Sequence, residues 1–290
     1  MRISLPKIEH SLTGFEALVQ LHEMTKDCLF DEVQIDMKQA TWFDADMCAA
    51  FGAILYHIGD RLNSIHLMSI PRNVEKILSK NGFLSHYGRE QIPDTWGTTI
   101  PYRRFAAKDD RYFAAYVEEE FVRRSEMPKM SSGLVKKFRE SVFEIFSNSV
   151  IHSQTRLGIF SCGQYFPNRN TLDFSVADLG IGIRKNVQDN LGLDLSAEDA
   201  IEWATQGTNT TKRGRIPGGL GLKLLSEFIQ LNGGQLQIVS DTGYWSLEKD
   251  GVRKKLLKGA FPGTLVNIEI NTSDVRSYFL KSALSETDIF

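Results

Sequence analysis

Hydrophobic residues recur at three- and four-residue spacing in several stretches of the chain and alternate with polar residues in others. The first pattern predicts amphipathic helices at 12–26, 46–58, 71–84, 111–124, 135–150, 197–204 and 223–231. The second predicts strands at 2–5, 33–37, 64–70, 172–178, 235–240 and 265–270. Pro71 at a helix start and Gly233 after a helix end agree with these limits.

The order of these elements predicts two folded parts. Helices and strands alternate from the first residue onward, so we expect a small α/β domain at 1–90. A connecting helical linker follows at 91–132, then a second domain at 133–275 and a C-terminal tail at 276–290. With 290 residues, 42% of them hydrophobic, the chain has enough apolar material for two cores.

The helix at 135–150 carries a candidate catalytic pair on its polar side. Glu144 and Asn148 are four residues apart, so their side chains project in the same direction. An amide oxygen is a suitable ligand for Mg²⁺, and a carboxylate one turn earlier could orient a water for attack on a phosphate. The alternative is that both are solvated positions of an amphipathic helix.

A strand that ends in Asp178, followed by Gly180 and Gly182, suggests recognition of a purine base. The carboxylate can accept a hydrogen bond from an exocyclic amino group, and the glycines allow close approach of the backbone. An ordinary turn after a strand would show the same sequence pattern. Further along, Gly219 and Gly221 open a helix whose free N–H groups favour phosphate.

Taken together, these segments resemble the GHKL superfamily of ATPases and kinases, which has the Bergerat ATP-binding fold. The resemblance rests on Glu144-x-x-x-Asn148, Asp178-x-Gly180-x-Gly182, Gly219-x-Gly221 and Gly263-Thr264, in that order. It implies a mixed sheet covered on one face by helices. The form of the first motif is closest to the ATPases and the anti-sigma-factor serine kinases.

The resemblance also implies the role of each motif residue in a site for ATP and Mg²⁺. Glu144 would act as the catalytic base and Asn148 as the metal ligand. Asp178 would bind the adenine base with support from Thr264, and Gly180 and Gly182 would also lie in the nucleotide-binding site. Contacts to the nucleotide phosphates would come from Thr208, Lys212, Gly219, Leu220, Gly221 and Leu222. Family members place a lid over the phosphates in the region of 184–216, where Lys212 or Arg215 would pair with phosphate charge.

The N-terminal segment 35–47 and its small-residue helix resemble the STAS domain of anti-sigma-factor antagonists. That family carries a phosphorylated serine at the turn where this chain has Ala45 and Asp46. Asp46 would therefore either mimic the missing phosphoserine or cap the following helix. The resemblance implies a protein partner, with a STAS-type protein as one candidate. Helices before the ATP domain form dimer contacts in several relatives, which leaves a homodimer open.

Composition narrows the classes of function. The net charge of −2 provides no general attraction to nucleic acid or anionic membranes, and no apolar run approaches membrane-spanning length. Three scattered cysteines without metal-ligand spacing, and no secretory signal pattern, favour a cytoplasmic protein.

Three functions remain after these exclusions. The first is an ATP-hydrolysing regulator in which lid closure controls a protein partner. The second is a serine/threonine kinase that acts on a STAS-type partner, and the third is an ATP-binding scaffold without turnover. Glu144 favours the first two, because a scaffold has no need for a base.

Overall fold

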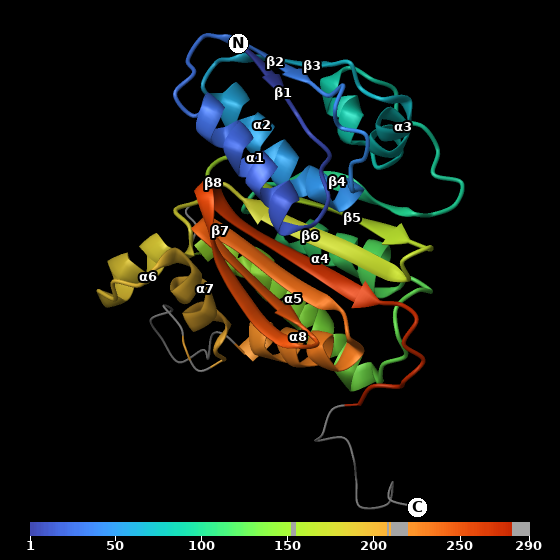
Figure 1. Cartoon of the computed structure of the whole chain (residues 1–290). Coiled ribbons are helices and arrows are strands. Elements are labelled where there is room, and N and C mark those ends of the chain that lie inside the picture. The colour runs from blue at the N-terminus through green and yellow to red at the C-terminus, as the bar shows by residue number, and fades with distance from the viewer. Residues whose placement is uncertain (152–154, 208, 210–219, 280–290) are drawn as a thin grey trace, which may run out of the picture.

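In the computed structural model, which describes residues 1–151, 155–207, 209 and 220–279, the chain forms two sheets separated by a layer of helices (Figure 1). Strands β1 (Arg2–Ser4), β2 (Glu32–Asp36) and β3 (Ser64–Met68) make a parallel sheet in that order. The second sheet has the order β4-β5-β6-β8-β7. The fold is therefore mixed α/β, as expected.

The five-stranded sheet is antiparallel at every pairing, which corrects the expected mixed sheet. Its strands are β4 (Thr99–Phe105), β5 (Ile159–Phe166), β6 (Thr171–Asp178), β7 (Gln235–Glu248) and β8 (Gly251–Asn271). Short connections join β5 to β6 and β7 to β8, and a short connection can only reverse the chain into an antiparallel neighbour. The sequence interpretation missed β4 and β5 and placed the start of β8 too late.

Helices cover both faces of this sheet, whereas the sequence interpretation expected them on one. On one face lie α4 (Asp110–Val117), α5 (Ser132–Ile151) and α8 (Leu220–Asn232). On the other lie α1 (Leu12–Thr25) and α2 (Cys48–Asp60), which also cover the inner face of the three-stranded sheet (Figure 1). The layer of α1 and α2 is thus shared by the two sheets.

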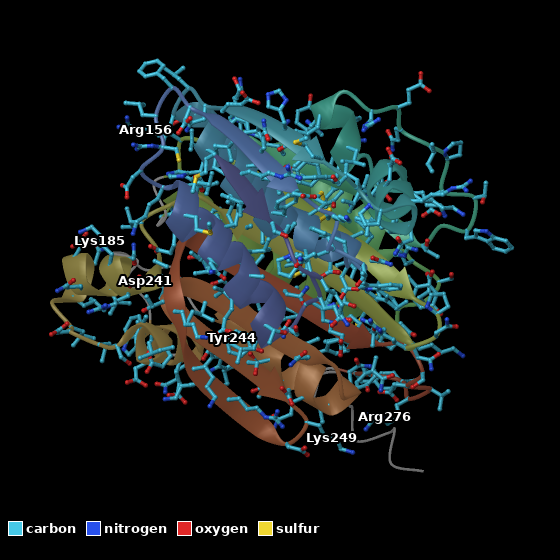
Figure 2. The ribbon with its side chains drawn as sticks, turned by 45° about the horizontal axis from the view of Figure 1, so that its top comes forward. Arg156, Lys185, Asp241, Tyr244, Lys249 and Arg276 are labelled. Carbon is cyan, nitrogen blue, oxygen red and sulfur yellow. The ribbon has the colours of Figure 1, made fainter. Side chains whose placement is uncertain are left out.

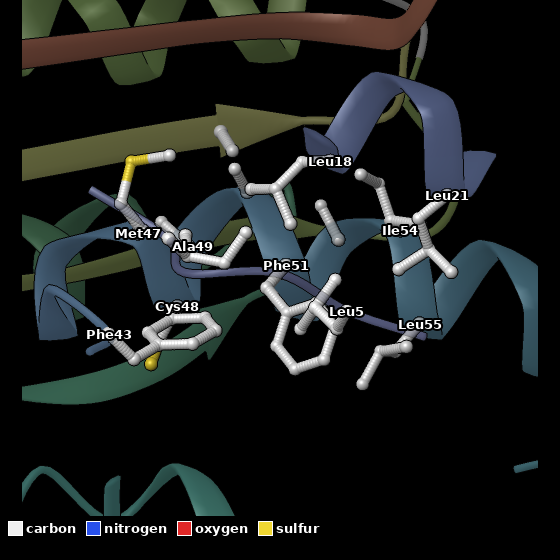
Figure 3. Close-up of a cluster of buried hydrophobic side chains, with 14 of the residues drawn as sticks. Leu5, Leu18, Leu21, Phe43, Met47, Cys48, Ala49, Phe51, Ile54 and Leu55 are labelled. Carbon is white, nitrogen blue, oxygen red and sulfur yellow. The ribbon is translucent and has the colours of Figure 1, made fainter. Parts of the chain in front are cut away.

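The α1 and α2 layer has an apolar core that extends into both sheets. Leu18 and Leu21 of α1 pack with Phe51 and Ile54 of α2, close to Phe43 (Figure 3). On the side of the large sheet lies Tyr244 of β7, which Figure 2 labels, and its ring centroid is 5.9 Å from that of Phe15. Further buried residues of the large sheet that belong to the same core are Tyr102, Phe160, Cys162, Ala177, Val239, Leu257, Phe261 and Leu265.

The segment 91–132, expected to be a helical linker, contributes to the C-terminal part of the fold. Its strand β4 is the edge of the five-stranded sheet and pairs with β5. Helix α4 continues as a π-helical turn, η3 (Glu118–Val122), and the ring of Phe121 stacks on that of Phe174 at 4.5 Å. We attribute the missed strand to its composition, because Arg103 and Arg104 interrupt the apolar pattern.

The remaining helices lie at the edges of the two sheets. Helix α3 (Arg72–Lys80) ends before Gly82, whose φ of +81° favours glycine, and a short 3₁₀ helix, η2 (Phe83–Tyr87), follows. The predicted helix at 71–84 is therefore two shorter elements. Helices α6 (Ile183–Leu191) and α7 (Ala197–Thr205) lie beside β7 (Figure 1). Among the described residues, no helix combines the length and apolar character needed to cross a bilayer.

Candidate functional site

A row of three polar residues crosses the large sheet where β6, β8 and β7 come together. Asp178 pairs with Thr264, and Thr264 pairs with Ser240. The hydroxyls of Thr264 and Ser240 are 3.0 Å apart, and the Asp178 Oδ1 accepts a hydrogen bond from the Gly180 N–H at 2.9 Å. The sequence interpretation named Asp178 and Thr264, and the structure brings them together as neighbours.

Asp178 and Thr264 lie on the face of the sheet that α5 and α8 cover. Side chains alternate along a strand, so Asp178 shares a face with Phe174 and Val176, and Thr264 shares one with Val266 and Ile268. These apolar residues belong to the core that includes α5 and α8. The candidates for adenine recognition, Asp178 and Thr264, therefore lie on the same side of the sheet as α5, which carries the candidate metal ligand Asn148.

The ends of the elements also coincide. Helix α5 ends at Ile151 and β5 begins at Ile159, which pairs with Asp178, so Asn148 lies near the same end of the sheet. Helix α8 runs antiparallel to β7 after the turn at Gly233. From Gly221 to Asn232 the helix is about 17 Å long, and the strand from Gln235 to Ser240 is about 17 Å as well. The N-terminus of α8 therefore lies at the Ser240 end.

A hydrogen bond ties the candidate base directly to the candidate phosphate-binding helix. The Glu144 Oε2 accepts from the Gly221 N–H at 2.9 Å, so the carboxylate occupies the positive end of the α8 dipole. A Cβ at Gly221 would lie 2.2 Å from that oxygen. The Cβ would also lie 3.1 Å from the Ser141 Cα, so the close contact of α5 with α8 favours glycine here, in addition to any role toward phosphate.

Two further glycines of the motifs have structural reasons of their own. Gly182 has a φ of +76° and caps α6, and a Cβ there would lie 3.1 Å from the Ser240 hydroxyl. A Cβ at Gly263 would lie 2.0 Å from the backbone oxygen of Asp178. Both glycines therefore allow the strand ends to pack closely, which is a different reason from the expected approach to a base.

Ser240 is a residue that the sequence interpretation missed. Its hydroxyl oxygen accepts from the Ile183 N–H at 2.9 Å, and its O–H donates to the Gly263 carbonyl at 3.0 Å. It therefore connects the start of α6 to the end of the Asp178 row. The available signal was its place as the last residue of the predicted strand 235–240, at the same end as the glycine motifs.

The lid region is described only in part. Helix α7 agrees with the predicted helix, and the Ser196 side chain caps it by accepting from the Asp199 N–H at 3.3 Å. Lys254 binds Asp199 and Glu202 of this helix at 2.8 and 2.6 Å. Thr208, Lys212, Arg215 and Gly219 lie outside the described residues. Leu220 begins α8, and Leu222 packs half-buried against the core of the C-terminal part.

Asp46, the residue at the STAS-like turn, does not cap α2. It lies in the 3₁₀ turn η1 (Ala45–Met47), and the helix cap is Met47 without a side-chain bond. The Asp46 carboxylate is fully buried and accepts a hydrogen bond from Asn267 of β8 at 3.0 Å. The N-cap interpretation of Asp46 is therefore wrong, because the large sheet provides the hydrogen-bond donor.

A surface groove of about 680 Å³ lies apart from the Asp178 row, on the N-terminal unit along β3 and η2. The residues that line it include Gln34, His66, Met68, Tyr87 and Arg89.

No family model matches the sequence, and no curated protein resembles it at a significant level. The chemistry of the site must therefore follow from its own geometry.

Proposed function

We propose that this protein binds ATP with Mg²⁺ at the end of the large sheet, in the manner of the GHKL ATPases, and hydrolyses it. The observation that carries the proposal is the pairing of Asp178 with Thr264 on the face covered by α5 and α8. Asp178 and Thr264 would hold the adenine. The N-terminus of α8 would contact the phosphates through Gly221 and Leu222.

The geometry of α5 supports roles for Asn148 and Glu144 in the same site. Both residues are half-buried, and Asn148 lies one turn beyond Glu144, toward the end of the sheet that carries Asp178. Asn148 would bind Mg²⁺ through its amide oxygen. Glu144 would orient the attacking water once phosphate takes over the Gly221 N–H that it now accepts.

The regulatory part of the proposal concerns the partner. Bound nucleotide would change the surface near α6 and α7. Helix α6 begins with a hydrogen bond to Ser240, the neighbour of Thr264, and α7 packs on β7. A protein partner would respond to that change. The kinase alternative differs in one respect only, since the phosphate would pass to a hydroxyl of a STAS-type partner in place of water.

Calorimetry with ATP and MgCl₂ tests the binding step. We expect wild-type protein to bind one ATP, Asp178→Asn to lose at least tenfold in affinity, and Asn148→Ala to lose the dependence on Mg²⁺. Asn73→Ala, at an exposed position of α3 away from Asp178, is the matched control and should bind as wild type. Equal affinity in all four proteins would overturn the proposal.

Turnover is tested with Glu144→Gln, which keeps an oxygen for the Gly221 N–H and removes the base. Release of labelled phosphate should fall by roughly 10² to 10⁴ while ATP affinity stays within about twofold. Label that appears on an added STAS-type protein, with none free, would favour the kinase. Binding without any turnover in wild-type protein, alone and with such a partner, would favour the scaffold.

A further inference from the structure

A second group of polar residues lies on the opposite face of the large sheet, in the seam, which we define as the contact of residues 8–10 and 43–46 with β6 and β8. An isolated parallel bridge joins Ile8 to Phe43. The backbone N–H of His10 then donates to the Asp44 Oδ2 at 3.1 Å, and the backbone N–H of Asp44 donates to the Ile8 carbonyl at 2.9 Å. These contacts hold His10 beside Asp44, and the Gln237 side chain of β7 donates to the His10 carbonyl at 3.2 Å, which ties the segment to the large sheet.

The His10 imidazole lies between carboxylates on both of its nitrogen atoms. The Nδ1 is 3.1 Å from the Asp44 Oδ2. The Nε2 is 3.3 Å from the Glu269 Oε2 and 3.8 Å from the Asp173 Oδ1. Asp173 and Glu269 are paired residues of β6 and β8, so the sheet itself fixes the spacing of two of these groups.

Several oxygen atoms in the seam are buried without a hydrogen-bond partner in the described part of the chain. They are the Asp173 Oδ1, the Asp46 Oδ1 and the Asn267 Oδ1, and all three residues are fully buried. A buried oxygen without a partner is destabilising, and a charged one more so. The Asp173 oxygen is directed toward His10, where a cation would satisfy it.

Carboxylates outnumber basic groups in the seam. Four of them gather here, those of Asp44, Asp46, Asp173 and Glu269. Near them lie the imidazole of His10 and the guanidinium of Arg169, which is 3.6 Å from Asp44. A divalent ion would offset the repulsion between the carboxylates of this group.

We propose that His10, Asp173 and Glu269 bind a divalent transition-metal ion. The Nε2 and the two carboxylate oxygens lie within 4.8 Å of one another, and the two separations from the Nε2 are close to those of ligands in one coordination sphere. Ligands at about 2.1 Å from an ion are roughly 3.0–3.4 Å apart. One imidazole with two carboxylates suits Mn²⁺ or Zn²⁺ better than Mg²⁺.

The surroundings of the three ligands fit a metal site. The Asp44 Oδ2 lies 3.1 Å from the Nδ1 of His10 without an aligned hydrogen bond, and a carboxylate in this position can orient a metal-binding imidazole. The Glu269 side chain is 19% exposed and that of His10 is 10% exposed, which gives the ion a route of entry. The ion would join the segment before α1 to two strands of the large sheet, and so link the two halves of the fold.

Nucleotide-free protein, stripped with EDTA and dialysed, provides the test. Calorimetry with MnCl₂ and ZnCl₂ should give one ion per chain for at least one of the two metals. Asp173→Asn and Glu269→Gln should each weaken binding by more than tenfold. Asp36→Asn, a carboxylate on the outer face of the small sheet, is the matched control and should bind as wild type.

Asn148→Ala separates this site from the proposed nucleotide site, because it should leave Mn²⁺ or Zn²⁺ binding unchanged in the absence of ATP. Should the seam variants fail to fold, the wild-type histidine ¹H–¹⁵N spectrum gives the answer. Addition of Zn²⁺ should shift the Nε2 resonance of His10 and leave that of exposed His66 in place. No bound ion, or an unshifted His10, would overturn the proposal.

Discussion

The two faces of the five-stranded sheet are built from the same strands but by different chemistry. Toward α5 and α8, β6 contributes Leu172, Phe174 and Val176, which close an apolar core with the helices. Toward α1 and α2, the same strand contributes Asp173 and Ser175, both fully buried. The alternation of one strand thus serves two interiors, one apolar and one in which buried polar residues lie beside an apolar core.

This difference determines how each face is stabilised. An apolar core gains free energy from area and close packing, and tolerates exchange between side chains of similar volume. A buried polar layer depends on particular partners, and the loss of one leaves the other unsatisfied. We therefore expect the apolar face to set the overall stability. The polar face should fix the position of the N-terminal unit, which consists of the three-stranded sheet with α1 and α2, relative to the large sheet.

The largest expected effect comes from the apolar face. Phe174→Ala removes a fully buried ring that stacks on Phe121 at 4.5 Å and should lower the free energy of unfolding by about 3–5 kcal/mol. Urea denaturation measures the change. Phe30→Ala, at a side chain that is 73% exposed, should change it by less than about 0.5 kcal/mol. Similar values for the two variants would break the comparison.

A titratable group on the polar side of the sheet should have the next largest effect. Burial, together with the nearby His57, lowers the pKa of His22 on α1 from 6.5 to about 4, against a smaller opposite effect of Glu23. As the pH falls from 6.5 to 4, His22 takes up a proton in the unfolded chain before it does in the folded one. Its contribution to stability is therefore complete above pH 6.5 and is lost toward pH 4, by about 2–3 kcal/mol.

Urea denaturation at pH 7 and pH 4.5 tests this sign. His22→Leu should reduce the loss of stability between the two pH values by about 2 kcal/mol compared with wild type. His66→Gln on the exposed outer face should reproduce the wild-type loss. An unchanged loss in His22→Leu would mean that other groups account for the acid sensitivity.

The smallest expected effect tests the amide that bonds to Asp46 across the seam. Asn267→Ala removes the donor to the Asp46 carboxylate and to the Ser175 hydroxyl, and should lower the free energy of unfolding by about 1–2 kcal/mol in EDTA-containing buffer. Asn73→Ala removes an amide that is exposed and bonded to Thr41, and should have an effect below about 0.5 kcal/mol. If Asp46→Asn is added to Asn267→Ala, the two losses should not sum, because they share one bond.

The regular elements were predictable wherever one periodicity persisted. The strands at Leu172, Leu236 and Leu265 and the helices that end in Ile151 and Asn232 all have a clear apolar side. Strand β4 was missed because a short edge strand with two arginines has no such side. The meeting of Asp178 with Thr264 was predicted through the family resemblance, since strand pairing over so long a separation leaves no local signal.

The polar face could not be predicted from alternation alone. Asp173, Ser175 and Asn267 occupy the positions where an exposed strand would also be polar, and the sequence does not state what covers them. Asp46 was misinterpreted for the same reason, because a local cap is the usual partner of an acidic residue at a helix start. Its actual partner is Asn267, more than two hundred positions further along the chain.

The positions of the three cysteines give the protein a natural probe of its own opening. Cys162 on β5 contacts the backbone oxygens of Ala45 and Asp46, and both it and Cys48 are fully buried, while Cys28 is half-buried near the N-terminus. Burial raises the pKa of the Cys162 thiol well above its usual range, so this thiol reacts with alkylating reagents only when the N-terminal unit lifts from the sheet. Timed alkylation followed by mass spectrometry would therefore measure how often the layer of α1 and α2 separates from the five-stranded sheet, without any label added to the chain.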